Sequence, residues 1–170
     1  MTQEVCDPSF DELSLIVPSK LPDYLAKGVI ASSKLAPFSE PLVALVCDFS
    51  KLLLAKQETK KYPELVALAF KFRRSTLSKE KKAFCHESNV VVRPLGIAFH
   101  VAPSNVDSIF LYSGLISFLL GNFNVIRISG KFNSQLDFVL KVLKEAFSHH
   151  KNLEDRFVVC TYPRNSNLSE

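Results

Sequence analysis

A strand, a helix and a second strand follow one another between residues 97 and 129, which read IAFHVAPSNVDSIFLYSGLISFLLGNFNVIRIS. Residues 97–102 are an apolar run that ends at Pro103, and residues 123–129 are a second such run. Between them, residues 105–120 have the length and apolar character of a buried helix. Apolar strands that alternate with helices predict a parallel sheet joined by right-handed crossovers. The stretch therefore predicts an α/β fold.

The pattern extends in both directions. Residues 134–147 carry apolar side chains at helical spacing, and residues 156–162 (RFVVCTY) predict the next strand. The β-branched run VVV at residues 90–92 predicts a strand on the amino-terminal side. Parallel sheets are covered on both faces, which agrees with continuous apolar runs. Only eight residues follow the last strand, so we expect one sheet edge and part of the helix over residues 106–120 to be exposed.

A helical segment precedes the α/β region. Ser39 suits an N-cap, Pro41 suits a first turn, and apolar residues then repeat at helical spacing as far as Leu53. A second helix is predicted to start near Pro63 and to continue towards Leu77. Residues 1–38 read as an arm that wraps another surface. The expected organisation is an amino-terminal arm (1–38), a helical segment (39–87) and the α/β region (88–170).

Composition excludes several classes of protein. Of the 170 residues, 47% are apolar and 22% are charged, whereas intrinsic disorder needs the opposite balance. The uninterrupted apolar run covers only residues 109–120, and a membrane span needs about 20 apolar residues. We therefore expect no membrane span. The first residues, MTQEVCDPSFDELS, are acidic and polar and do not form a signal peptide, so we expect a cytoplasmic protein.

The four cysteines indicate buried thiols. Cys6, Cys47, Cys85 and Cys160 are widely spaced, form no CxxC pair and have no histidine at zinc-ligand spacing. Cys47 and Cys160 lie in apolar runs, which is typical of free thiols in a protein core. We expect no metal site.

The charge of the chain is mild. Its net value of +4 permits an anionic small ligand and does not require nucleic acid. Six basic residues lie in KFRRSTLSKEKK at residues 71–82, which fits either a nucleic-acid patch or the solvated face and end of a helix. No known binding motif accompanies the run, and cations suit a helix carboxyl terminus, so the second interpretation is favoured. We expect no nucleic-acid partner.

Two groups of residues lie where a ligand would bind in an α/β sheet, beyond the carboxyl ends of strands. Ser104 and Asn105 follow the first strand, and their alternative role is to cap the following helix. After the strand at residues 123–129, Gly130 and Lys131 complete a small basic rim with Arg127 and Ser129. That rim could hold a phosphate, or it is a solvated turn. Neither a P-loop nor a GxGxxG motif is present.

Several segments together resemble the acyl-CoA reductases, a branch of the aldehyde dehydrogenase superfamily that includes the reductase of the bacterial luminescence fatty acid reductase complex. They are PLGIAFHVAPSN (94–105), GNFNVIRIS (121–129), YPELVALAF (62–70), FRRSTL (72–77) and VVCTYPRNSNLSE (158–170). The resemblance implies a Rossmann-like, aldehyde dehydrogenase-like cofactor domain that is incomplete relative to the family. It also implies reduction of a fatty acyl thioester to an aldehyde by NAD(P)H, through a cysteine that forms an acyl-enzyme.

The resemblance assigns roles to particular residues. Asn105 matches the asparagine whose side chain stabilises the oxyanion, a contribution typically of about 100–1,000-fold in rate. The cofactor-binding positions are Ala102, Arg127, Ser129 and Lys131. Gly130 replaces a glutamate that would hold the ribose 2′-hydroxyl, and the absence of that carboxylate favours NADPH over NADH.

The sequence also departs from the family. In the family the nucleophile lies downstream of the cofactor motifs, and no cysteine here follows them in a suitable glycine-rich context. Cys160 lies inside a predicted strand, where its side chain is packed. The expected protein is therefore the amino-terminal part of an acyl-CoA reductase, with fatty acyl-CoA as the substrate of the complete enzyme. We expect it to associate with a second copy or with a separate carboxyl-terminal half. The alternative is a non-catalytic interaction or regulatory subunit.

Overall fold

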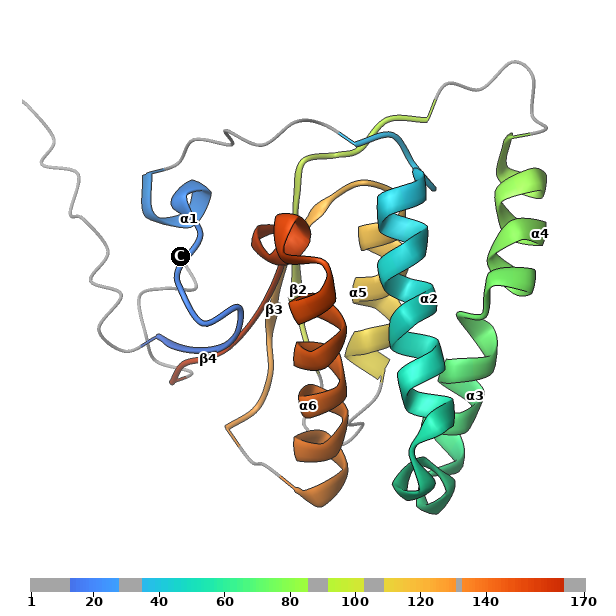
Figure 1. Cartoon of the computed structure of the whole chain (residues 1–170). Coiled ribbons are helices and arrows are strands. Elements are labelled where there is room, and N and C mark those ends of the chain that lie inside the picture. The colour runs from blue at the N-terminus through green and yellow to red at the C-terminus, as the bar shows by residue number, and fades with distance from the viewer. Residues whose placement is uncertain (1–12, 28–34, 86–91, 103–108, 131–132, 164–170) are drawn as a thin grey trace, which may run out of the picture.

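A computed structural model describes residues 13–27, 35–85, 92–102, 109–130 and 133–163 (Figure 1). The strands are β1 (Ser14–Val17), β2 (Ile97–Val101), β3 (Phe123–Arg127) and β4 (Phe157–Thr161). The helices are α1 (Asp23–Lys27), α2 (Glu40–Ala55), α3 (Pro63–Lys71), α4 (Arg74–Cys85), α5 (Ile109–Leu119) and α6 (Ser134–His149), with 3-10 turns η2 (Gln57–Lys61) and η3 (Lys151–Arg156).

The four strands form one sheet in the order β1-β4-β3-β2. β2, β3 and β4 are parallel, and the pairing of β2 with β3 runs from Ile97 opposite Phe123 to Val101 opposite Arg127. Because helices join these consecutive parallel strands, the predicted α/β class is confirmed. β1 pairs antiparallel with β4, with Ser14 opposite Thr161. Sequence patterning did not predict β1, because four residues in a proline-rich arm carry too little periodic signal.

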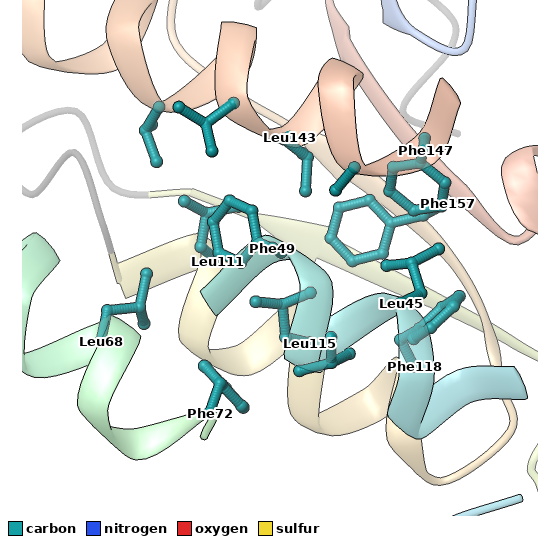
Figure 2. Packing of buried hydrophobic residues seen from close by; sticks show 14 of the residues in the cluster. Leu45, Phe49, Leu68, Phe72, Leu111, Leu115, Phe118, Leu143, Phe147 and Phe157 are labelled. Atoms are coloured by element: carbon teal, nitrogen blue, oxygen red, sulfur yellow. The ribbon is translucent and has the colours of Figure 1, made fainter. Parts of the chain in front are cut away.

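One face of the sheet carries the main core (Figure 1). α2, α5 and α6 lie on this face, and α3 packs against α2. The centre of the core contains Phe118, Phe147 and Phe157, whose ring centroids lie 5.7–6.1 Å apart. These rings come from α5, α6 and β4, and they interlock with leucines of α2 and α5 (Figure 2). Burial of this many large apolar side chains is the main force that holds the helices on the sheet.

The opposite face is covered only in part. Tyr24 of α1 packs edge-on against Phe123 with ring centroids 5.0 Å apart, and a second apolar cluster extends from there over β4. At β2, however, Ile97, Phe99 and Val101 are exposed on this same face. Coverage of both faces, which the apolar runs predicted, therefore holds for β3 and β4 and fails at β2.

Two predicted elements differ from the structure. The helix expected from Pro63 towards Leu77 is two helices, because Phe72 leaves the helical path at φ −93° and ψ 16°. The turn buries Phe72 completely, and Arg73 and Thr76 donate side-chain hydrogen bonds to the carbonyl of Phe70. Val92, placed in a strand by its β-branched neighbours, is exposed and lies in no strand, while residues 90–91 lie outside the described residues.

The basic run at residues 71–82 spans the end of α3 and most of α4. Its cations lie mainly at the surface, and Lys71 and Arg74 form ion pairs with Glu80 and Glu40. This arrangement agrees with a solvated helix face. Within the described part of the chain, no helix is long and apolar enough to cross a membrane. No cluster of metal-ligating side chains occurs among the same residues.

Candidate functional site

The candidate site lies at the carboxyl ends of the three parallel strands. Ala102 directly follows β2, and its N–H donates to the carbonyl of Arg127 at 2.8 Å. Arg127 ends β3 and lies opposite Cys160 of β4. The sheet therefore brings Ala102 and Arg127 together, as parallel pairing requires. Two other predicted site residues, Asn105 and Lys131, lie outside the described residues.

The Arg127 side chain packs against the residue that follows β4. Its Nη2 donates to the carbonyl of Tyr162 at 3.0 Å, and its Cζ lies 4.9 Å from the centroid of the Tyr162 ring. Its Nε is buried and has no hydrogen-bond partner among the described residues. A buried N–H without a partner is costly in a protein, so this atom marks a position where an acceptor would be stabilising. Tyr162 was missed because its contact joins residues 35 positions apart in the chain.

The rim after β3 is loosely packed among the described residues at one position, Gly130. Ile128 extends the sheet pairing by donating to the carbonyl of Cys160 at 2.9 Å, and Ser129 follows it half-buried. Gly130 is exposed, and among the described residues a Cβ placed there would meet only the Thr161 hydroxyl oxygen, at 3.6 Å. Its backbone does not require glycine.

Cys47 and Cys160 are poorly suited to nucleophilic chemistry. Cys160 is 1% exposed, and burial raises the pKa of its thiol to about 11, an effect that the nearby charge of Arg127 reduces only in part. Burial also raises the pKa of the Cys47 thiol. The thiolate is the nucleophilic form, so both groups are largely unreactive near neutral pH. Their prediction as buried free thiols is confirmed.

The Gly121-Asn122 motif has a structural role at the opposite end of the strands. Gly121 adopts φ +89°, and a Cβ there would lie 2.4 Å from the carbonyl oxygen of Leu35. The Asn122 side chain accepts hydrogen bonds from the N–H groups of Leu95 and Gly96, at 2.7 and 3.3 Å. The motif therefore closes α5 with a left-handed turn at Gly121 and fixes the start of β2 beside β3.

Buried polar groups continue from this motif into the sheet. Asn124 is fully buried, and its Nδ2 donates to the carbonyls of Asn122 and Arg156 while its Oδ1 lies 3.1 Å from His100 Nε2. The Arg156 guanidinium donates to the Gly121 carbonyl and stacks on the ring of Phe123. Burial holds the pKa of Arg156 below its usual value. These groups link β2 and β3 to the residue before β4, so their role is to hold the sheet together.

A family model described as acyl-CoA reductase (LuxC) matches residues 49–169. The chain belongs to the LuxC acyl-CoA reductase family. The matched region starts inside α2 and includes every strand except β1, so it contains Ala102, Arg127 and the rim after β3. The resemblance inferred from sequence motifs is thereby confirmed. Neither the curated proteins nor the solved structures gave a match.

Proposed function

We propose that this chain is the nucleotide-binding part of a LuxC-family reductase that converts a fatty acyl thioester of coenzyme A to the aldehyde. The proposed class of reaction follows from membership of the LuxC family. The parallel β2-β3-β4 unit supports a Rossmann-like nucleotide site, because ligands of open α/β sheets bind beyond the carboxyl ends of the strands. In this proposal the chain is incomplete relative to the full reductase and acts in the cytoplasm.

The residues at the carboxyl ends fit a nicotinamide dinucleotide. Arg127 retains a buried Nε–H without an acceptor among the described residues, and a phosphate or ribose oxygen is a suitable acceptor. Ala102 and Gly130 are small, so the dinucleotide could approach the backbone there. Ser129 and Lys131 complete the proposed binding set. When bound, the cofactor supplies the hydride that reduces the acyl group.

We propose NADPH as the preferred cofactor, because no carboxylate occupies position 130 and Arg127 is cationic. Titration calorimetry with NADPH and NADH tests this preference in the wild type. Arg127→Ala should remove most of the difference between the two affinities, and Gly130→Glu should weaken NADPH binding more than NADH binding. Arg73→Ala, which removes an exposed arginine between α3 and α4, is the matched control. Equal wild-type affinities would reject the preference.

Gly130→Glu is informative because Gly130 is exposed and, among the described residues, a Cβ at this position meets no atom closer than 3.6 Å. Urea denaturation of the variant separates a loss of binding caused by charge from a loss caused by unfolding. A carboxylate at this position repels a ribose 2′-phosphate and accepts a hydrogen bond from a 2′-hydroxyl. The variant should therefore move the preference towards NADH at unchanged stability.

Catalysis needs a nucleophile that neither Cys47 nor Cys160 supplies. We propose that Asn105 donates a hydrogen bond to the oxyanion and that the attacking cysteine belongs to a polypeptide segment outside residues 1–170. The purified chain should then produce no aldehyde from fatty acyl-CoA and NADPH. Aldehyde formation that Cys160→Ala abolishes would show that the buried Cys160 is the nucleophile.

The alternative is a non-catalytic subunit that retains the scaffold. The buried, unreactive state of Cys47 and Cys160 is the observation in its favour. Calorimetry separates the two, because a purely structural subunit binds neither NADPH nor NADH, whereas the cofactor-binding part of a reductase binds at least one of them.

A further inference from the structure

A pocket lies between α2 and α4, and Figure 1 shows α4 on the outer side of the helices. The pocket has a volume of about 440 Å³, which falls within the range of small-molecule sites, roughly 300–1,000 Å³. α4 lines it with Arg74, Leu77, Ser78 and Lys81, whose spacing of three and four residues places them on one face of the helix. The first turn of α2 forms the opposite wall.

The pocket has an apolar floor and a cationic rim. Val43 and Leu77 are 6% and 1% exposed, so they form the floor between the helices. Arg74, Lys81 and Lys82 also line the pocket, and all three are exposed. Such side chains cover apolar surface with their aliphatic stems and keep the charged ends in water. The pocket therefore combines apolar contact at its floor with positive charge at its opening.

The positive charges of the pocket exceed the negative ones. Among the described residues of the lining, Glu40 is the only carboxylate, and its Oε1 lies 2.5 Å from Nη2 of Arg74. This hydrogen bond, followed by the charges of Arg74 and Lys81, holds the pKa of Glu40 below its usual value. Within the described part of the chain, neither Lys81 nor Lys82 forms an ion pair. The described lining therefore has two positive charges in excess.

This pocket is separate from the candidate nucleotide site. The N–H of Phe38, two residues before α2, donates to the carbonyl of Leu119 at the end of α5, at 2.7 Å. Because α5 leads into the start of β3, the first turn of α2 lies at the amino-terminal ends of the parallel strands. Ala102 and Arg127 lie at the carboxyl ends. The pocket and the nucleotide site therefore occupy different ends of the sheet.

We propose that the pocket between α2 and α4 binds an amphiphilic small anion, an alkyl chain that ends in a carboxylate or phosphate group. The anionic group binds Lys81 and Lys82 at the rim, and the alkyl chain contacts Val43 and Leu77 at the floor. Charge-assisted hydrogen bonds favour an anion, and the burial of apolar area favours an alkyl chain over an inorganic ion. This site does not depend on the proposed reductase function, since no nucleotide takes part in it.

Titration calorimetry of the full chain with decanoate, without nucleotide, tests the proposal. Decanoate should bind at one site. Acetate lacks the alkyl chain and decanol lacks the charge, so each should bind at least about tenfold more weakly than decanoate. Decyl phosphate is the second probe, and the tighter of the two anions identifies the preferred head group. High salt should weaken the binding of both, because the lysines are exposed.

Two pairs of adjacent lysines provide matched variants. Lys81→Gln combined with Lys82→Gln removes both charges and keeps most of each aliphatic stem, so it should weaken decanoate binding at least about tenfold. Lys60→Gln combined with Lys61→Gln removes two exposed charges from η2, beyond the carboxyl end of α2. This control should leave the affinity unchanged. Far-UV circular dichroism checks that both double variants are folded.

Glu40→Gln changes the charge balance in the opposite direction. It removes the carboxylate that pairs with Arg74, so one more cation becomes available to the ligand. Decanoate binding should become at least about threefold tighter, because a like charge in the pocket is lost. A substitution that only disturbed the packing would weaken binding, so the direction of the change separates the two effects.

Chemical acetylation followed by mass spectrometry locates the bound anion. Saturating decanoate should protect Lys81 and Lys82 from acetic anhydride and leave Lys60 and Lys61 reactive.

Several results would overturn the proposal. They are the absence of binding by both decanoate and decyl phosphate, decanol that binds as tightly as decanoate, equal loss of affinity in the two double variants, and equal reactivity of Lys81 and Lys82 with and without decanoate. A single-stranded oligonucleotide that displaces decanoate through these two lysines would assign them to a polyanion, and would likewise reject a small amphiphile as the ligand.

Discussion

Cys160 links the environment of one residue to the pH dependence of folding. Burial raises the pKa of its thiol from 9.0 to about 11, so the folded state holds the proton more tightly than the unfolded state. Between these two pH values the Cys160 thiol is ionised in the unfolded state and still protonated in the folded state. The free energy of unfolding should therefore fall as the pH rises from about 9 to about 11, with no loss from this group at lower pH.

Urea unfolding at pH 8 and at pH 10.5 measures the effect. The wild type should lose more stability between the two pH values than Cys160→Ala, although the alanine variant starts from a lower stability because it leaves a small cavity. The pKa of Tyr24 is also raised, first by burial and then by the charges of Asp155 and Cys160. Tyr24 is present in both proteins, so the part of its shift that burial causes is common to them, and the part that Cys160 causes belongs to the effect being measured. The same pH dependence in both proteins would contradict the buried thiol as its source.

At the scale of single residues, the sequence predicted where residues lie in the sheet better than it predicted which side chains they contact. The strand-end rule placed Arg127 at the carboxyl ends of the strands, and the family resemblance added Ala102. The hydrogen bond between these two residues confirms that they are close. The contact between Arg127 and Tyr162 was not predictable, because it joins the ends of β3 and β4 and depends on the fold. The proposed roles of Asn105 and Lys131 remain predictions.

Among the elements, the turn between α5 and β3 depends on one glycine. Gly121 combines φ +89° with a Cβ position 2.4 Å from the Leu35 carbonyl oxygen and 2.9 Å from Pro94 Cγ. Gly121→Ala should lower the free energy of unfolding by about 1–3 kcal/mol, because it adds backbone strain and a steric contact. Gly130→Ala, where the added methyl group meets no close atom, should change it by no more than about 0.5 kcal/mol.

Urea denaturation of the two variants beside the wild type makes this comparison. Each variant adds one methyl group to a glycine at one end of β3, so general effects of the glycine-to-alanine change are matched. Equal midpoints for the two variants would show that the chain relaxes around Gly121 without cost.

Element boundaries followed from local signals where these were strong. The apolar runs gave β2, β3 and β4, and the helical spacing gave α2 and α6, because long periodic segments bury a face in any arrangement. The break between α3 and α4 was missed because Leu68, Phe72 and Leu77 continue an apolar pattern across it. Only the packing in three dimensions decides that the turn at Phe72 separates two helices, each with its own buried side chains.

For the whole molecule, residues 13–27 protect β4. β1 pairs with the outer edge of β4, and Tyr24 is 5% exposed against the second apolar cluster. Deletion of residues 1–27 should expose that edge and cluster and produce soluble aggregates. Deletion of residues 1–12 keeps β1 and Tyr24 and is the matched control.

Static light scattering and urea midpoints of the two truncated chains measure the outcome. The longer deletion should scatter more and unfold at lower urea than the shorter one. Combining the longer deletion with Phe99→Lys distinguishes aggregation through β4 from aggregation through β2. Aggregation through β4 should persist when β2 carries the added charge. A longer deletion that behaves like the shorter one would show that β4 does not need β1.

The pairing of Ser14 with Thr161 also sets an order of events during biosynthesis. At a ribosomal rate of roughly 5–20 residues per second, β1 leaves the ribosome on the order of ten seconds before its partner strand β4. The βαβ contacts form between segments that are close along the chain. The pairing of β1 with β4 spans the largest sequence separation in the described sheet, so it has the largest entropic cost of loop closure. β1 therefore remains unpaired until β4 has been synthesised. A bulky amino-terminal fusion should slow the pairing of β1 with β4 in particular.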